Sequence, residues 1–135
     1  MKPATDASQK STQAAKPFHS RVRKLALIGA GKLGEGLLSG LLGSQLVPVG
    51  CVEATVAVAD RSRADYLIEK YGIKAHTNNA EAVSGASLVL ICLKPQQVKG
   101  VLHEVKKKLR KDAVIISCAA SVTTSLIEQI GRAHV

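Results

Sequence analysis

The sequence predicts an α/β fold with a doubly wound, mostly parallel sheet of about five or six strands and helices on both faces. Short apolar runs alternate with helical stretches along the chain, which is the order of βαβ units. The runs Ser87 to Leu93 and Ala113 to Cys118 are apolar almost throughout, as expected of strands that are buried on both faces. Near the N-terminus, glycines with the spacing G-x-G-x-x-G join an apolar run to a helical one.

The segment from Lys24 to Gly40 reads KLALIGAGKLGEGLLSG and predicts a strand, a tight turn and a helix. Gly29 lets the strand turn sharply, Gly31 leaves room for a pyrophosphate close to the backbone, and Gly34 lets the helix pack tightly on the strand. The helix N-terminus would direct free N–H groups at the phosphates. Because Asp60 ends the next apolar run, we interpret the motif as a dinucleotide site of the Rossmann type. The alternative is a structural glycine turn without a ligand.

The first half of the chain then continues this alternation. After the strand at 25–28 and a helix at 33–42, a loop around Pro48 leads to a second strand, EATVAVA, at 53–59. Asp60 closes that strand, and the following helix runs to Tyr71, where Gly72 ends it.

The second half adds three further strands. We expect a short strand at 73–76 and a short helix at 78–84 that Asn78 caps. The strand at 87–93 ends at Lys94-Pro95, where proline suits the first turn of a helix from about 96 to 110. A strand at 113–118 and a helix that ends near Ile130 complete the pattern. The loops after strands one, two, four and five should converge on one crevice at the carboxyl ends of the sheet.

Composition and charge limit the classes of partner. Hydrophobic residues make up 46% of the chain, while aromatic residues are 2%, which suits an aliphatic parallel-sheet core and argues against base stacking on nucleic acid. The net charge is +9, but six of the 19 basic residues lie in the first 24 positions. A second basic run, at 106–111, is typical of a solvated helix end. We therefore expect no nucleic-acid partner.

The chain divides into a basic extension at 1–23, expected to be disordered, and one domain at 24–135. Cys51, Cys92 and Cys118 lack disulfide or metal spacing, and we expect the last two to be buried thiols. These features favour a reducing, cytoplasmic location, no metal site and no membrane span. The acid-poor extension also leaves organelle targeting as an alternative.

The end of the second strand gives two conflicting indications about the cofactor. Asp60 could bind the ribose hydroxyls of NAD, whereas Arg61 and Arg63 with Ser62 could bind the 2′-phosphate of NADP. We favour NADP(H), with Ser62, Arg63 and nearby N–H groups on the phosphate, Arg61 stacked on the adenine edge and Asp60 turned away. In the alternative, the two arginines are ordinary surface residues and NAD is the cofactor.

Together the motifs resemble the N-terminal domain of pyrroline-5-carboxylate reductases. IGAGKLGEGLLSGLL, NNAEAV, LICLKPQQV and VIISCAASVTTSLIEQIG carry this resemblance, and the last two are the most specific. One departure is Ser121, where the family commonly has glycine. By resemblance, the NADPH site comprises Ile28, Gly29, Ala30, Gly31, Lys32, Leu33, Gly34, Asp60, Arg61, Ser62, Arg63, Asn79, Cys92, Leu93, Lys94, Pro95, Cys118, Ala119 and Ala120.

The resemblance implies an NADPH-dependent enzyme that reduces the C=N bond of 1-pyrroline-5-carboxylate, a small imine, to L-proline. It also implies that a helical domain after Val135 forms the homo-oligomer and most of the substrate pocket, so we expect 1–135 alone to be inactive. The catalytic residues are unknown, since no acid, base or nucleophile stands out. Alternatives are another NADP oxidoreductase, such as a deazaflavin-linked reductase or a hydroxyacid dehydrogenase relative, or a stand-alone nucleotide-sensing domain.

Overall fold

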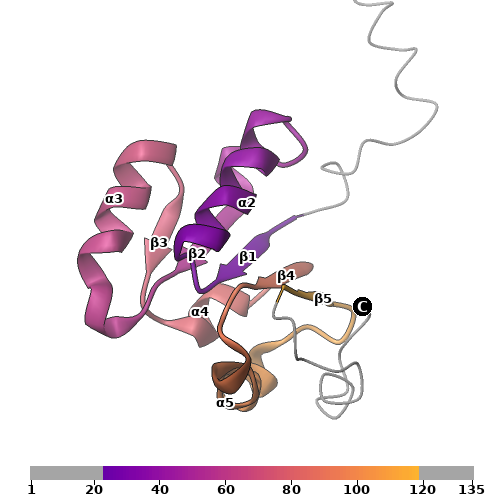
Figure 1. Cartoon of the computed structure of the whole chain (residues 1–135). Helices are drawn as coiled ribbons and strands as arrows, with labels where there is room; N and C mark the ends of the chain where they lie inside the picture. The colour runs from indigo at the N-terminus through magenta and orange to yellow at the C-terminus, as the bar shows by residue number, and fades with distance from the viewer. Residues whose placement is uncertain (1–22, 119–135) are drawn as a thin grey trace, which may run out of the picture.

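A computed structural model of the chain describes residues 23–118. In that region five strands form one parallel sheet in the order β3-β2-β1-β4-β5 (Figure 1). The doubly wound parallel fold predicted from the sequence is confirmed. The strands are β1 (Leu25–Ile28), β2 (Val52–Thr55), β3 (Lys74–His76), β4 (Leu88–Ile91) and β5 (Val114–Ser117).

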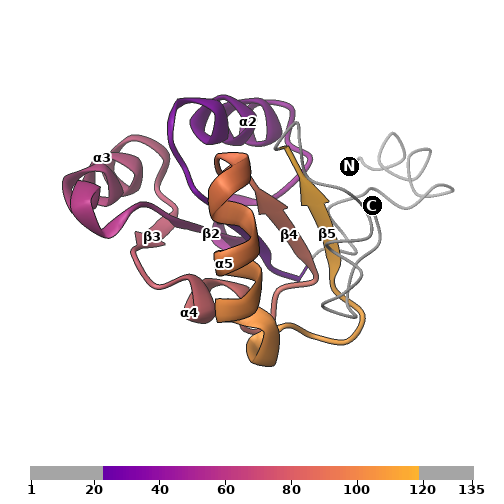
Figure 2. The same ribbon diagram turned by 60° about the horizontal axis from the view of Figure 1, so that its bottom comes forward.

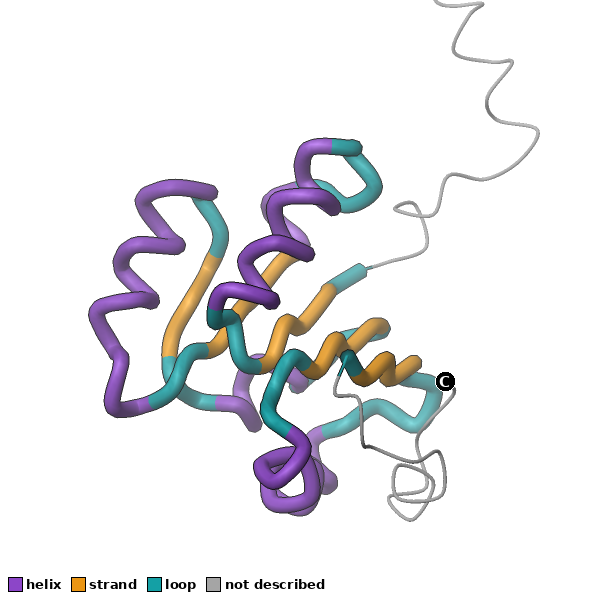
Figure 3. Tube along the Cα trace, in the orientation of Figure 1, coloured by secondary structure: helices purple, strands orange, loops and turns teal. Residues whose placement is uncertain are grey.

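Four α-helices and three short 3-10 helices connect these strands (Figure 3). Gly72, at φ +74°, ends α3, and the Asn78 side chain accepts a hydrogen bond from Glu81 N–H at the start of α4, both as predicted. The helices are α2 (Lys32–Gly43), α3 (Arg61–Tyr71), α4 (Asn79–Val83), α5 (Pro95–Val105), η2 (Val49–Cys51), η3 (Val58–Asp60) and η4 (Lys106–Lys108).

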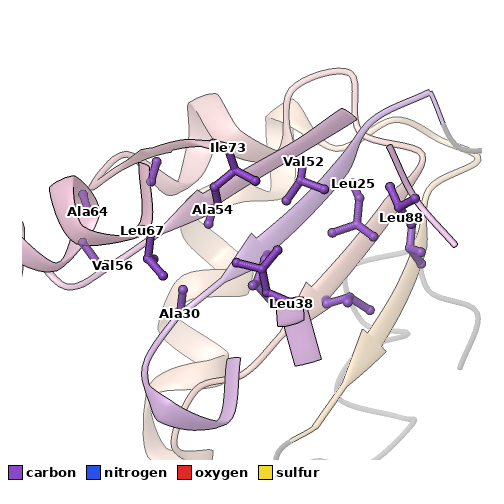
Figure 4. Close-up of a cluster of buried hydrophobic side chains, with 14 residues drawn as sticks. Leu25, Ala30, Leu38, Val52, Ala54, Val56, Ala64, Leu67, Ile73 and Leu88 are labelled. Carbon is purple, nitrogen blue, oxygen red and sulfur yellow. The ribbon is translucent and has the colours of Figure 1, made fainter. Parts of the chain in front are cut away.

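The helices cover both faces of the sheet and create two aliphatic cores (Figure 2). On one face, Leu38 of α2 and Leu67 of α3 belong to one buried cluster with Leu25 and other strand residues (Figure 4). On the other, Val98 and Leu102 of α5 pack with residues of α4 and the sheet. The buried residues of both cores are aliphatic, and Tyr71 packs at the margin of the first core. This packing holds the carboxyl ends of the strands in place.

Strand β2 is shorter than predicted. The apolar run 53–59 was expected to be one strand, but β2 ends at Thr55, and only Val56 N–H adds a further bond, to His76 O at 2.9 Å. The backbone then turns into η3, and Val58 is 68% exposed. Hydrophobicity alone misplaced this boundary, because the chain must leave the sheet to reach α3.

Strand β5 is the second correction. It was expected to be buried on both faces, but Val114 and Ile116 are 36% and 41% exposed, while Ile115 between them is fully buried. β5 lies at the sheet edge, and the register pairs Val114 with Leu88, which places it on the face that carries α2 and α3. No described helix covers this end of that face.

Two smaller boundaries also differ. Helix α5 ends at Val105 and passes into η4, although a helix to about residue 110 was expected. Strand β4 occupies 88–91 of the predicted 87–93. The predicted extension, apart from Arg23, and the predicted helix that ends near Ile130 lie outside the described residues.

Candidate functional site

The turn after β1 has the sharp, left-handed backbone geometry that the glycine spacing predicts. Gly29 adopts φ +85°, a conformation that L side chains rarely reach. Its N–H lies 3.3 Å from Thr55 Oγ1, and Ala30 N–H donates to Thr55 O at 2.8 Å. Gly31 N–H donates back to Gly29 O at 2.8 Å. The end of β2 therefore holds this turn directly in front of the first turn of α2.

The three motif glycines differ in what a Cβ atom would meet. At Gly29 it would lie 2.5 Å from Leu93 Cδ2, and at Gly34 it would lie 2.9 Å from Gly29 O. These two positions are filled by the protein itself, as close packing of helix on strand requires. At Gly31 a Cβ would meet nothing within 4 Å. The space beside Gly31 is thus free for a ligand, at the N-terminus of α2.

A cleft of about 320 Å³ opens beside this turn at the carboxyl ends of the strands. It runs from the end of β2 past the glycine turn to the end of β4 and the start of α5. Its position is the one where doubly wound sheets bind their ligands. Of the residues predicted for the site, those lining the cleft are Gly29, Ala30, Gly31, Asp60, Arg63, Asn79, Cys92, Leu93 and Lys94.

The other predicted residues lie around the cleft or outside the described region. Ile28 and Gly34 are buried behind the turn, whereas Arg61 and Ser62 are exposed at the start of α3. Lys32, Leu33, Pro95 and Cys118 are not among the lining residues. Ala119 and Ala120 lie outside the described residues. The sequence analysis missed some of the wall residues: Thr55, Val56, Ala57, Gln97 and Val101.

Of these missed residues, Gln97 carried a detectable signal. It is the third residue of α5, and its Oε1 accepts a hydrogen bond from Lys94 N–H at 3.2 Å. A glutamine at this distance from a helix start is a recognised capping pattern. Val56 and Ala57 carried none, because they were assigned to the interior of a longer strand.

The two arginines after Asp60 have different surroundings. Arg61 is exposed, but Arg63 is held by the protein: its Nε donates to Ala30 O at 2.6 Å, and its NH2 group donates to Glu35 Oε1 at 2.8 Å. Arg63, predicted with Ser62 to bind the phosphate, therefore already donates two hydrogen bonds within the protein, and its phosphate role stays a prediction.

Glu35 is the residue most clearly missed by the sequence analysis. Its carboxylate accepts hydrogen bonds from Tyr66 OH at 2.6 Å and Tyr71 OH at 2.7 Å, and Lys70 Nζ lies 3.3 Å away. These hydroxyls, together with Lys70 and Arg63, lower the pKa of Glu35 to about 2. The signal was present in the spacing, since the four partners lie on one face of α3.

Cys92 and Cys118 follow neighbouring strands, and Cys118 N–H donates to Ile91 O at 2.8 Å. Both were expected to be buried, but both are half-buried. Burial and the adjacent Cys118 thiol raise the pKa of Cys92 to about 12. Cys92 therefore remains a neutral thiol in the wall of the cleft, and not a nucleophile.

A second polar cluster lies away from the cleft, around buried Glu53. His76 Nε2 and Lys24 Nζ lie 2.5 and 2.9 Å from its carboxylate, and Glu81 is nearby. Burial opposes ionisation of Glu53, but these hydrogen bonds hold its pKa below the usual value. His76 Nδ1 accepts from Asn78 N–H, so its proton lies on Nε2 toward Glu53. This arrangement and the lysine make the cluster a network of ion pairs and hydrogen bonds.

Comparison with known proteins identifies the family of this chain. Residues 24–121 match the family described as NADP oxidoreductase, coenzyme F420-dependent. The chain belongs to this family of NADP oxidoreductases. The family match includes the glycine turn, the Asp60 segment and the ends of β4 and β5. The open space at Gly31, the positive φ of Gly29 and the adjacent helix N-terminus fit a dinucleotide cofactor.

Within the family, the chain is similar to pyrroline-5-carboxylate reductases. It is 31% identical over 110 residues to pyrroline-5-carboxylate reductase 1 of Bacillus subtilis, and 32% identical over 111 residues to that of Escherichia coli. These alignments cover 79% and 82% of this chain, but 36% and 39% of the relatives. The chain thus spans less than half the length of the curated relatives that it matches.

Comparison with solved structures also finds pyrroline-5-carboxylate reductases. The structure of a pyrroline-5-carboxylate reductase from Coxiella burnetii superposes with a TM-score of 0.73 at 28% identity, over 80% of this chain and 39% of that one. The Plasmodium falciparum pyrroline carboxylate reductase with NADP bound superposes with a TM-score of 0.65 at 17% identity, over 79% and 37% of the two chains. The second comparison shows the shared fold. Among the described residues, no helix has the length and hydropathy to cross a membrane.

Proposed function

We propose that this chain is the NADPH-binding part of a pyrroline-5-carboxylate reductase, which reduces the C=N bond of 1-pyrroline-5-carboxylate to give L-proline. The observation that carries this proposal is the cleft beside Gly31, which is lined by segments from the ends of β1, β2 and β4. The similarity to reductases of this name over about four fifths of the chain supports the substrate.

The described residues have distinct parts in this proposal. The turn at 29–31 and the N-terminus of α2 would hold the pyrophosphate, and Asn79 would lie toward the adenosine end. Backbone and side chains at 92–94 would flank the nicotinamide. Bound NADPH supplies a hydride to the imine carbon. The walls formed by Cys92, Leu93 and Val101 would limit the access of water on one side.

We further propose that NADPH is preferred over NADH. Arg61 is exposed at the first position of α3, and Ser62 follows it, so both are available to a 2′-phosphate. Arginine suits this role, because its guanidinium can bind phosphate through two parallel hydrogen bonds and can also stack on adenine. Asp60 lines the cleft, and its carboxylate would be turned from the phosphate.

The proposal also covers the remaining part of the substrate pocket and the contacts between subunits. The matched relatives are more than twice as long as the aligned segment. We propose that the imine pocket is completed by a region equivalent to their unmatched part, in a homo-oligomeric cytoplasmic enzyme. The exposed face of β5, with Val114 and Ile116, would be covered in that assembly.

A direct test is to exchange the matched segment in a working relative. In a chimera, residues 24–121 of this chain would replace the aligned segment of the Bacillus subtilis reductase, and NADPH oxidation with 1-pyrroline-5-carboxylate would be measured. We expect turnover, and we expect its loss when the chimera also carries Gly31→Val. A folded chimera that binds NADPH but does not reduce this imine would contradict the proposed substrate.

The family description favours a second candidate, an oxidoreductase that uses coenzyme F420. The two candidates share the NADP cleft and differ in the second reactant. Loss of the visible absorbance of oxidised F420 on addition of NADPH and the chimera would support the second. The LICLKPQQV segment, at the end of β4, carries the resemblance that favours the imine.

A further inference from the structure

Arg63 joins three parts of the cofactor cleft through one guanidinium. It is the third residue of α3, its Nε donates to Ala30 O in the glycine turn, and its NH2 group donates to Glu35 in α2. The distances are 2.6 and 2.8 Å, and the side chain is only 21% exposed. Two of its three nitrogens are therefore already bonded within the protein.

Glu35 accepts the second hydrogen bond of this guanidinium through its Oε1. Tyr66 and Tyr71 donate to its other carboxylate oxygen, Oε2, and Lys70 Nζ lies within 3.3 Å of that oxygen. With a pKa of about 2, Glu35 is ionised throughout the neutral pH range. The charge of Arg63 is thus balanced by a fixed carboxylate, and a phosphate that approached Arg63 would also approach Glu35.

The bond to Ala30 O has a consequence for the ligand side of the turn. The peptide group that links Ala30 and Gly31 is planar, so an arginine that fixes its oxygen also fixes the direction of Gly31 N–H. That N–H donates to Gly29 O at 2.8 Å, so Arg63 and Gly29 hold the two ends of one peptide group. This peptide group lies beside the open space where a pyrophosphate would pass, and it directly precedes the first N–H groups of α2. A phosphate site is effective when its donors are oriented before the ligand arrives.

We propose that Arg63 is a positioning residue that orients the glycine turn for the pyrophosphate, with Glu35 as its anchor, and that it does not recognise the 2′-phosphate. Arg63 then supports the binding of NADP and of NAD equally, whereas Arg61 favours NADP over NAD. This inference rests on the proposed function, in that the cleft must bind a nicotinamide dinucleotide.

The competing role, direct contact of Arg63 with the 2′-phosphate, predicts that neither Arg63→Lys nor Glu35→Gln changes the affinity for NAD⁺, which has no 2′-phosphate. Under that role, Arg63→Lys would keep the cation and much of the preference for NADP. Glu35→Gln would remove a nearby negative charge and strengthen NADP binding alone. Under the positioning role, Arg63→Lys loses the two-point bridge, because lysine cannot donate to Ala30 O and Glu35 with the fork of arginine. Glu35→Gln weakens the bridge, because a neutral amide with one acceptor oxygen holds the guanidinium less firmly than a carboxylate.

The test is calorimetric titration of NADP⁺ and NAD⁺ into the 135-residue chain and its variants. Ordering one backbone residue corresponds to about a tenfold change in an equilibrium constant. We therefore expect Arg63→Lys and Glu35→Gln to weaken both cofactors about tenfold, with their affinity ratio unchanged. Arg61→Ala should weaken NADP⁺ more than NAD⁺ and so lower the affinity ratio. Glu69→Gln, which removes an exposed carboxylate of the same helix, is the matched control and should change neither.

Hydrogen exchange in the absence of cofactor gives a second readout. We expect faster exchange of the Ala30 and Gly31 amides in Arg63→Lys and Glu35→Gln, but not in Glu69→Gln. A retained NADP preference with unchanged NAD⁺ affinity and unchanged exchange in Arg63→Lys would overturn the positioning role while leaving the proposed function intact. A folded wild-type chain that bound neither cofactor would overturn both.

Discussion

Replacement of Gly31 by valine separates folding from cofactor binding. Gly31 has φ −79°, which valine can adopt, and an added Cβ meets no heavy atom within 4 Å. Valine is a poorer residue than glycine at the start of a helix, by about 1 kcal/mol. Valine also restricts the backbone of the unfolded chain, and this restriction offsets about 0.4 to 1 kcal/mol of that loss of stability. The free energy of unfolding should therefore change by no more than about 1 kcal/mol.

The expected effect on binding is much larger. The side chain would occupy the space through which the pyrophosphate passes, and forcing atoms into a filled site costs about 1 to 3 kcal/mol. Since the backbone N–H groups would also be blocked, we expect the upper end of that range, about a hundredfold loss of NADP⁺ affinity.

Gly29→Ala should instead lower the free energy of unfolding. Its left-handed φ costs an L residue about 1 to 2 kcal/mol. The new Cβ would lie 2.5 Å from Leu93 Cδ2 and 2.9 Å from Cys92 O, which adds about 1 to 3 kcal/mol. Thermal melting and calorimetry of both variants would show these differences. Gly36→Ala, at an exposed α2 position with open space around it, is the control that should leave binding unchanged. Wild-type NADP⁺ affinity in a folded Gly31→Val protein would refute the assignment of the turn.

Three further outcomes are expected. A chain that begins at Arg23 should melt at the temperature of the full chain, since 1–22 has no apolar periodicity; a loss of several degrees would show that the extension contributes to the core. Because its hydrogen bonds lower the pKa of Glu35 from 4.5 to about 2 in the folded state, the ionised carboxylate stabilises the fold fully above pH 4.5. The stability advantage of wild type over Glu35→Gln should therefore shrink as pH falls from 4.5 toward 2 in acid titrations followed by circular dichroism, and an advantage independent of pH would contradict this. Purified 1–135 should oxidise no NADPH with 1-pyrroline-5-carboxylate above an enzyme-free blank, because the imine needs a second wall to hold it near the nicotinamide; steady turnover would place the whole catalytic site within this chain.

The sequence was informative wherever one residue type satisfies a local requirement. Glycine at 29 and 72 was predicted from turn and helix-end patterns, and both positions have positive φ. Asn78 was predicted as a helix cap, and it is one. These features depend on a few neighbouring residues, so a linear pattern contains them.

Features that depend on distant contacts were harder to predict. The end of β2 is set by where the chain must leave the sheet, and the exposure of Val114 is set by an edge position that hydrophobicity does not encode. The bridge from Arg63 to Glu35 joins residues 28 positions apart. Local composition predicted Arg63 as a phosphate ligand, and nothing nearby in the sequence indicated that Glu35 would accept a hydrogen bond from it.

The central claim, that NADP binds across the glycine turn between the ends of β2 and β4, is tested most directly by mapping amide NMR shifts during titration with NADP⁺. We expect saturable shifts at 29–31, 60–63 and 92–94, and none around Glu53 or in η4. Saturable binding whose shifts avoid Gly31 and gather at either of those other regions would contradict the claim.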